Sequence, residues 1–315
     1  MAEIGYFLSG EEHGPNALLE QAKGAEAHGF SSVWISDHFH PWLDEQGSSP
    51  FVWGVIGAIA ATTSLQVTTA VTCPTMRIHP AIVAQAAATA SLQLDGRFRL
   101  GVGTGEALNE HVLGDRWPGA DERIDQLREA IEVMRKLWTG EQLSFEGDHY
   151  VVDRARLYDH PTETIPVPIS AFGPKALDLA IEVGDGFVTA SPDGDSRQRY
   201  QDEGGTGPTM AGVKVCWGAD EDEAAKLAHH LWRNEGVPGE LAQELPMPGH
   251  FAQASELVTV EAIKDSHACG PDPERHVEIL KEYLDAGFDE VYVNQIGPDQ
   301  EGFFEFFESE VRPRL

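Results

Sequence analysis

The sequence predicts an α/β protein that folds as a single (β/α)8 barrel. Two observations support this: about eight β-type segments alternate with helical patterns, and no linker or shift in composition divides residues 1–315. Alternating segments are typical of a parallel sheet whose crossovers are helices, and a closed barrel needs about 250 residues or more. A doubly wound open sheet is the alternative, although eight repeats are many for that fold. We therefore expect one domain.

Apolar segments rich in β-branched and aromatic residues predict the strands. These segments are residues 4–8, 33–36, 65–71, 98–102, 167–172, 187–190, 213–217 and 290–295. Helices are predicted over residues 18–27, 81–92, 124–138, 174–183, 221–233 and 277–286. Pro80 before the second helix and the i, i+3, i+4 apolar stripe of the third are the clearest helix signals. Residues 140–160 and 235–258 fit no minimal repeat, so we interpret them as insertions.

The charge of the chain is strongly one-sided. It has 52 acidic and 22 basic residues, a formal net charge of −30, and the acids are scattered rather than gathered into a tail. A field of this sign repels nucleic acids and anionic membrane surfaces, which excludes both as partners. Self-repulsion destabilises a compact chain unless salt screens it, so we predict a salt-adapted protein. An ordinary acidic cytosolic enzyme is the alternative.

No segment predicts export or membrane insertion. The longest apolar run, residues 53–61, is shorter than the roughly 20 residues that span a bilayer, and the N-terminus lacks a basic region. The three cysteines, Cys73, Cys216 and Cys269, form no CxxC pair. This spacing fits a reducing compartment and argues against a zinc ribbon. We therefore expect a cytoplasmic protein that acts on a small molecule.

The most informative segment is residues 33–42, VWISDHFHPW. Its strand pattern ends abruptly in four polar or aromatic side chains, Asp37, His38, His40 and Trp42. In parallel α/β folds this carboxyl end of a strand is where ligands bind. His38 can exchange a proton near neutral pH, and Trp42 can border a substrate. A capping aspartate with two loop histidines is the purely structural alternative.

The His38-x-His40 pair also fits a metal-dependent hydrolase barrel. Such a site needs further His or Asp ligands from later strand ends. The ends at residues 170–173 and 189–192 supply no histidine. We therefore predict no bound metal and keep the hydrolase as a remote alternative.

A second junction, residues 100–110 with the sequence LGVGTGEALNE, ends another predicted strand. Its glycine spacing lacks the G-x-G-x-x-G fingerprint of dinucleotide binding, but three bare glycines let a flat ligand approach the backbone. Glu106 follows these glycines at the barrel mouth. Asn109 lies near a helix start, where backbone N–H groups favour anions. Cys73, at the end of the third strand, is a candidate nucleophile, although a packing role is the simpler interpretation.

Together the two junctions resemble those of the coenzyme F420-dependent glucose-6-phosphate dehydrogenase group. That group belongs to the luciferase-like barrels, which use F420 or flavin. The resemblance is carried by residues 36–42 and 101–110, with further likeness at 79–85, 173–174 and 184–187, so it spans nearly the whole chain. It implies a luciferase-like barrel, a homodimer, and an oxidoreductase that transfers hydride between an alcohol carbon and C5 of the deazaflavin.

The resemblance also implies roles for individual residues. The cofactor would be held by Asp37, Cys73, Gly105, Asn109, Gly173, Pro174 and Val71, whose peptide bond would be unusual and could be cis. His38 would take the proton of the substrate hydroxyl, and Glu106 would supply a proton to N1 of the ring. Trp42 would complete the catalytic group and, with Glu11, border the substrate. A base beside a cofactor face is the minimum for this chemistry, because hydride leaves fastest from an alkoxide-like carbon.

The chain departs from that group at the substrate phosphate. The group uses two lysines and an arginine there. The first lysine falls at Asp193 and the arginine at Glu301, while only Lys264 loosely matches the second lysine. Each like-charge contact with a phosphate costs roughly 1 to 4 kcal/mol. We therefore predict a neutral sugar, polyol or secondary alcohol as the substrate.

Two further functions remain open beside the F420-dependent dehydrogenase. One is an FMN-dependent monooxygenase or reductase of the same superfamily. The other is a non-catalytic barrel that only binds a flavin. The presence of both His38 and Glu106 argues against the second, because binding alone needs neither.

Overall fold

A ring of parallel strands forms the centre of the molecule in the computed structural model, which describes residues 2–315. Its strands are β1 (Glu3–Leu8), β2 (Ser32–Ile35), β3 (Gln66–Thr69), β4 (Phe98–Arg99), β7 (Ile169–Ser170), β8 (Phe187–Thr189), β9 (Thr209–Cys216) and β11 (Glu290–Gln295). They pair in the order β4-β3-β2-β1-β11-β9-β8-β7, and each pair is parallel. Each strand overlaps one of the eight predicted segments.

Val102 closes the ring between its two end strands. The Val102 N–H donates to the carbonyl of Pro168 over 2.9 Å, and the Val102 carbonyl accepts from the N–H of Ser170 over 2.8 Å. The predicted (β/α)8 barrel is therefore confirmed. Several strands are shorter than predicted, because Thr72 and Val102 join their neighbours only through single bridges.

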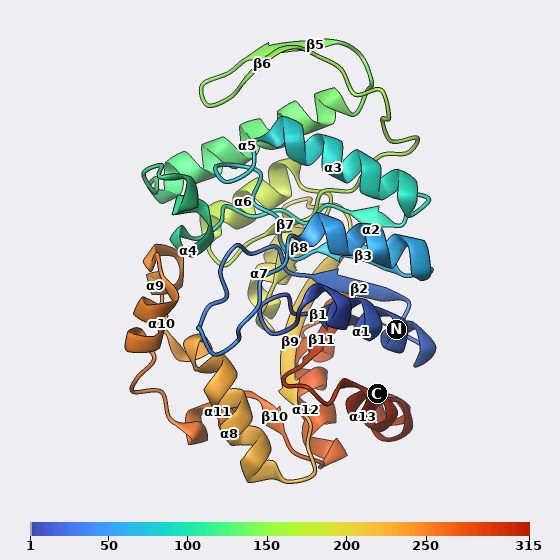
Figure 1. Ribbon diagram of the computed structural model, residues 1–315, viewed down its shortest axis with the longest axis vertical. Helices are drawn as coiled ribbons and strands as arrows, with labels where there is room; N and C mark the ends of the chain where they lie inside the picture. The colour runs from blue at the N-terminus through green and yellow to red at the C-terminus, as the bar shows by residue number, and fades with distance from the viewer. Residues whose placement is uncertain (1) are drawn as a thin grey trace.

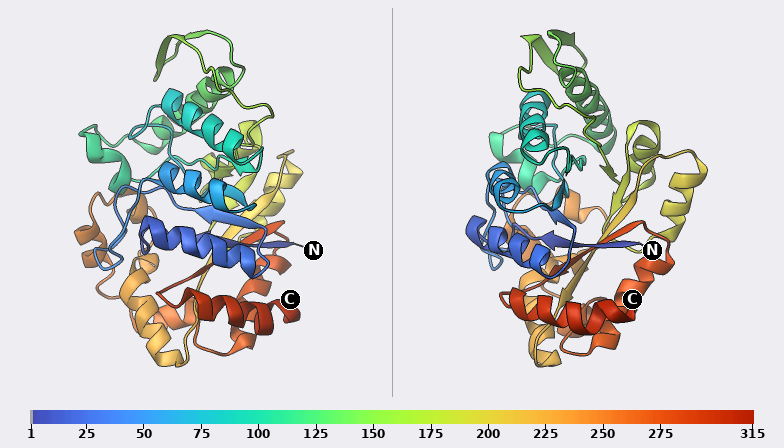
Figure 2. Two further views of the ribbon diagram at one scale, coloured as in Figure 1. Left: turned by 45° about the vertical axis from the view of Figure 1, so that its right-hand side comes forward. Right: turned by 90° about the vertical axis from the view of Figure 1, so that its right-hand side faces the viewer.

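Helices surround the ring of strands (Figures 1 and 2). They are α1 (Pro15–Ala27), α2 (Val52–Thr62), α3 (Pro80–Gln93), α5 (Ala120–Leu137), α6 (Pro174–Val183), α7 (Gly194–Asp202), α8 (Glu221–Trp232), α12 (Pro273–Asp285) and α13 (Gln300–Phe306). All six predicted helices are confirmed, with shifted ends. Helices α2, α7 and α13 were not predicted, because α2 has no charged face, α7 buries only Tyr200 and α13 spans only 7 residues.

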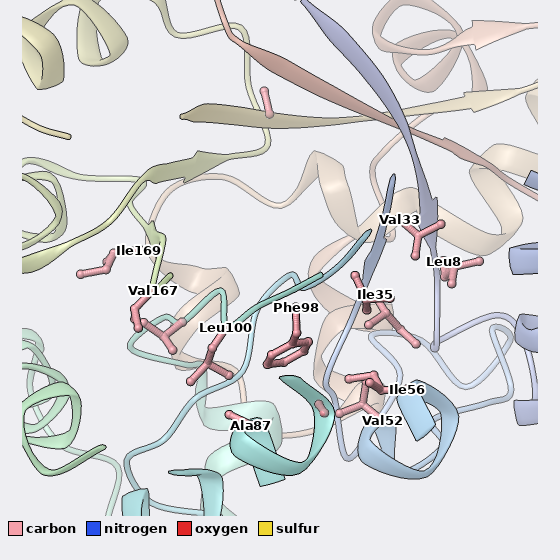
Figure 3. Packing of buried hydrophobic residues seen from close by; sticks show 14 of the residues in the cluster. Leu8, Val33, Ile35, Val52, Ile56, Ala87, Phe98, Leu100, Val167 and Ile169 are labelled. Carbon is pink, nitrogen blue, oxygen red and sulfur yellow. The ribbon is translucent and has the colours of Figure 1, made fainter. Parts of the chain in front are cut away.

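Two apolar layers hold the barrel together. The outer layer lies between strands and helices, and Figure 3 shows Phe98 and Leu100 beside the helices that carry Ile56 and Ala87. The inner layer fills the barrel, where Trp34 stacks on Tyr292 with 4.3 Å between ring centroids. A filled barrel has no central pore, so ligands reach it only at its ends.

Both predicted insertions lie outside the ring. The first contains the antiparallel hairpin of β5 (Leu143–Glu146) and β6 (Val151–Ala155), and the second contains α9 (Leu241–Glu244) and α10 (Pro248–Ala254). Three further short elements follow or precede them: α4 (Ala107–Glu110), α11 (Val260–Ser266) and β10 (Ala268–Cys269), which pairs with β9.

The second insertion stands on the side of the molecule where the candidate site lies. Figure 1 shows α4, α9 and α10 together on one side, opposite the two chain termini. Helix α4 directly follows the glycines that end the β4 segment. Among residues 2–315, no helix is both long enough and apolar enough to cross a bilayer.

Candidate active site

The segments that follow β1, β2 and β4 meet at the carboxyl end of the barrel. Their meeting point is His38, which lies between two carboxylates. The His38 Nδ1 atom is 3.2 Å from Glu11 Oε1, and its Nε2 atom is 3.4 Å from Glu106 Oε1. The side chain of Glu11 is 3% exposed, whereas those of His38 and Glu106 are 13% and 17% exposed. The imidazole therefore has a buried partner on one side and a more accessible one on the other.

Two serines fix Glu11 behind the imidazole. Its Oε2 atom accepts hydrogen bonds from Ser9 Oγ over 2.9 Å and from Ser36 Oγ over 2.8 Å. Burial raises the pKa of Glu11, but the charge of His38 and these hydrogen bonds outweigh burial and leave the pKa lower than usual. Glu11 is thus an anion held against Nδ1 of His38, so it contacts the predicted base rather than standing apart from it.

Asn109 joins the two predicted clusters. Its Oδ1 atom accepts from the backbone N–H groups of Phe39 and His40 over 2.7 and 2.8 Å, and its Nδ2 atom donates to Glu106 Oε1 over 2.5 Å. His40 Nδ1 lies 2.9 Å from the carbonyl of Leu108. Hydrogen bonds therefore hold α4 against the loop after β2. These bonds direct His40 toward α4 and leave His38 facing Glu106.

Trp42 forms the next part of the wall. Its ring lies edge-on to His38, with centroids 5.1 Å apart, and edge-on to Phe251 of α10 at the same separation. Its backbone N–H donates to Gln46 Oε1 over 2.8 Å. Phe251 is fully buried, so the second insertion supports the aromatic side of the site.

The segments after β3 and β4 form another wall, in which two glycines pack closely against Val71 and Cys73. A Cβ atom on Gly103 would lie 2.8 Å from Val71 Cγ2, and one on Gly105 would lie 3.2 Å from Cys73 Sγ. Gly105 also has φ +77°, which favours glycine. The peptide between Ala70 and Val71 is cis, which confirms the unusual bond predicted there. Glycine is thus required at both positions, because the segments pack too closely there to leave room for a Cβ atom.

Cys73 packs within this wall. It is buried, and burial raises the pKa of its thiol well above the usual value, with the charges of Glu110 and Glu106 adding to the effect. A thiol with a raised pKa is a poor nucleophile. Its position beside Gly105 supports the packing interpretation of Cys73, at the place where the cofactor wall was predicted.

Asp37 lies in a buried charged cluster that the sequence only partly predicted. Its Oδ2 atom accepts from Thr72 Oγ1 over 2.8 Å, and its Oδ1 atom accepts from Arg77 Nη2 over 2.9 Å. Arg77 also contacts Glu110 of α4, with 3.5 Å between Nε and Oε1. Arg77 and Glu110 were not predicted, because no motif marks them. The one available signal was a lone arginine after a strand end in a strongly acidic chain.

The remaining predicted residues form no hydrogen bond or ion pair with His38 among residues 2–315. Gly173 and Pro174 begin α6, where a Cβ on Gly173 would meet no atom within 4 Å. Lys264 of α11 pairs with Glu221 and Asp222 of α8, each 3.1 Å away. The structure therefore does not join Lys264 to Glu11 or Trp42 by a hydrogen bond or an ion pair. Within residues 2–315, no cluster of three or more His, Cys, Asp or Glu side chains could hold a metal ion.

Known proteins are similar to this chain in sequence. The model of the luciferase-like monooxygenase family matches residues 2–290. The chain is 36% identical to the F420-dependent glucose-6-phosphate dehydrogenase of Nakamurella multipartita, over 99% of this chain and 96% of that protein. It is also 36% identical to the enzyme of the same name from Microbacterium testaceum, over 99% of this chain and 97% of that protein.

Solved structures share the fold. An F420-dependent secondary alcohol dehydrogenase in complex with an F420–acetone adduct matches with a TM-score of 0.90 and 32% identity, over 99% of both chains. The F420-dependent tetrahydromethanopterin reductase of Methanopyrus kandleri matches with a TM-score of 0.79 and 24% identity, which shows the fold alone. These matches confirm the resemblance that residues 36–42 and 101–110 predicted. The chain belongs to the luciferase-like monooxygenase family, in its F420-dependent glucose-6-phosphate dehydrogenase-like group.

Proposed function

We propose that this protein is an F420-dependent oxidoreductase that interconverts a neutral alcohol and its carbonyl compound, with His38 as the general base. The observation that carries the proposal is the placement of His38 between the buried anion of Glu11 and the more accessible Glu106. The sequence relatives are named F420-dependent dehydrogenases, and the structural neighbour of TM-score 0.90 is an F420-dependent secondary alcohol dehydrogenase.

The residues present fit the deazaflavin cofactor. Gly103 and Gly105 let the segment after β4 pack closely against Val71 and Cys73, and the space beside Gly173 is open, since a Cβ atom there would meet nothing within 4 Å. Asp37 and Asn109 supply polar groups next to this wall, and α6 offers backbone N–H groups at its uncapped start near Gly173. When bound, F420 supplies a two-electron hydride carrier that does not need oxygen. FMN is the alternative occupant of the same wall.

His38 is arranged to take the proton of a substrate hydroxyl at Nε2. The carboxylate of Glu11 lies 3.2 Å from Nδ1, where its charge stabilises the imidazolium that forms. At an effective dielectric constant of 20, the attraction between an anion and a cation about 4 Å apart is about 4 kcal/mol. Glu11 therefore acts on the base, while Trp42 restricts where the substrate carbon can lie.

Glu106 provides the second proton-bearing group. Its Oε1 atom accepts from Asn109 Nδ2 and lies 3.4 Å from His38 Nε2, so the acid and the base face the same space. Proton transfer by a positioned side chain contributes about 10²- to 10⁴-fold to a rate. Two such adjacent groups can serve the substrate and the cofactor in the same turnover.

The substrate is neutral because this chain lacks the cations that a phosphate needs. Asp193 stands at the first lysine position and accepts from the backbone N–H of Ser196 over 3.0 Å as the cap of α7. Glu301 stands at the arginine position and lies 3.3 Å from His28. Lys264 is paired with two carboxylates. A dianionic phosphate near these groups would meet two anions and an already neutralised lysine.

Fluorescence titration of the purified protein tests the cofactor assignment. We expect F420 to bind and to be reduced on addition of a neutral secondary alcohol, while FMN binds more weakly. Tight FMN binding together with no F420 binding would refute the proposal and favour the monooxygenase or reductase alternative.

A further inference from the structure

Arg77, in the loop after β3, contacts both walls of the site. Its Nη2 atom donates to Asp37 Oδ1 over 2.9 Å and to the Asp37 carbonyl over 3.2 Å. Its backbone N–H donates to Glu110 Oε2 over 2.9 Å. The side chain of Arg77 is 7% exposed, and those of Asp37 and Glu110 are each 1% exposed. A charge this well buried is costly unless its partners are fixed.

The orientation of Asp37 depends on Arg77. One carboxylate oxygen accepts from Arg77 and the other from Thr72 Oγ1. Each oxygen of a carboxylate has two acceptor positions, so one remains on each oxygen for a ligand. Without the guanidinium, only Thr72 and the backbone would restrain the Asp37 side chain.

The orientation of α4 depends on the same residue. Glu110 lies on α4, which also carries Asn109 and directly follows Glu106. Arg77 holds Glu110 through its backbone N–H and faces it through Nε at 3.5 Å. Arg77 thus joins the loop after β3 to α4, the helix that directly follows Glu106.

The cluster contains one cation and two carboxylates. The other titratable groups that face Glu110 are Glu106, Cys73 and Tyr150, and none of them adds a positive charge. Burial raises the pKa of Glu110 to about 7, although Arg77 opposes this shift. Glu110 Oε1 has no hydrogen-bond partner among residues 2–315 and can carry the proton.

We propose that Arg77 is a positioning residue for the cofactor, which it serves by fixing the Asp37 carboxylate and by tying α4 to the loop after β3. The inference rests on the proposed function, in which Asp37 holds F420. Loss of the guanidinium leaves Asp37 and Glu110 as two unneutralised buried carboxylates. Protonation of either one relieves their repulsion, so cofactor affinity in such a variant depends on pH.

The test is the dissociation constant of F420, measured by fluorescence on the folded protein at about pH 6 and about pH 8. For Arg77→Met we expect the constant to rise at least about tenfold at the higher pH and by less than about threefold at the lower pH. Arg77→Lys keeps the positive charge but loses the planar guanidinium with its several N–H donors. We therefore expect its dissociation constant for F420 to lie between those of Arg77→Met and the wild type, with little pH dependence. Arg77→Met/Glu110→Gln removes the second anion and lowers the pH dependence seen with Arg77→Met.

Arg99→Met is the matched control, because Arg99 is also 7% exposed and pairs with Glu290 at the other end of the barrel. It should lower thermal stability without changing the dissociation constant of F420. Equal weakening by Arg77→Met and Arg99→Met would assign the effect to general stability and overturn the inference. Wild-type affinity in Arg77→Met at both pH values would overturn it as well. A wild-type protein that binds no F420 would instead refute the proposed function, and this inference with it.

Discussion

His38 owes its proposed role to its neighbours. Its ring lies within 3.2 Å of Glu11 and 3.4 Å of Glu106, and its edge contacts Trp42. For His38→Gln we expect turnover to fall about 10²- to 10⁴-fold, because the substrate proton loses its acceptor. The dissociation constant of F420 should change by less than about threefold. His230→Gln, a change at an exposed histidine of α8, is the control and should retain full turnover.

Glu110 makes folding stability depend on pH. Burial raises the pKa of Glu110 to about 7 in the folded protein, so the native state binds a proton more tightly than the unfolded chain does. Its contribution to stability is fully present below the unfolded pKa of about 4.3 and is lost as the pH rises through about 7. Glu110→Gln should therefore lose less stability than the wild type between about pH 5 and about pH 8.

Thermal melting at several pH values checks this prediction. The exposed Glu146 provides a control, since Glu146→Gln should leave the pH profile of the wild type unchanged. A profile for Glu110→Gln that parallels the wild type would show that Glu110 titrates as an ordinary carboxyl group.

At the residue scale, sequence reasoning found the side chains that stand directly at strand ends. Asp37, His38 and Glu106 each follow a strand by a few residues, so the parallel topology alone brings them together. Arg77 and Glu110 were missed because their contacts depend on how the loop after β3 folds back onto α4. The contact of Glu11 with His38 was not predicted for a similar reason, since it depends on Ser9 and Ser36.

At the element scale, the second insertion supports the substrate side of the site. Phe251 of α10 contacts Trp42 and is buried in a cluster with Leu43 and Leu108. For Phe251→Ala we expect a loss of about 3–5 kcal/mol in stability, and a higher KM for the alcohol because Trp42 loses its support. F420 affinity should stay within about twofold. Phe251→Leu should restore much of the lost stability and KM, and an unchanged KM in Phe251→Ala would remove α10 from the site.

Prediction of the elements succeeded where one face of a segment is apolar. Helices α5 and α12 have such a face, and their sequences predicted them. Helix α2 is apolar almost throughout, and α7 is polar almost throughout, so neither shows the periodicity on which the predictions relied. The short helices α9 and α10 depend on tertiary contacts that no local pattern reveals.

At the scale of the whole molecule, the net charge of −30 predicts a dependence on salt. The Debye length falls from about 10 Å at 0.1 M salt to about 3 Å at 1 M, which screens repulsion between surface carboxylates. We expect the melting temperature to rise by several degrees between about 0.1 M and about 2 M KCl. A melting temperature that is constant or falls would favour the ordinary acidic enzyme.

The uncharged outer face of α2 and α3 predicts a homodimer. Neither helix contains a charged residue, although the chain has 52 acidic residues. Phe51 and Ile82 are exposed there, at 64% and 57%. Two copies of so acidic a chain can meet with least repulsion through this face. Light scattering should give twice the 34.4 kDa of one chain, and Ile82→Glu should give the monomer. A wild-type monomer at micromolar concentration would contradict this prediction.

The central claim is that this barrel uses F420 to oxidise or form a neutral alcohol. The most direct measurement compares kcat/KM for F420 reduction by neutral secondary alcohols and polyols with kcat/KM for glucose 6-phosphate. Because the resemblance places Asp193 and Glu301 where its members have two phosphate-binding cations, we predict that the best neutral substrate exceeds glucose 6-phosphate by about tenfold or more. A kcat/KM for glucose 6-phosphate above that of every neutral alcohol tested would contradict the account.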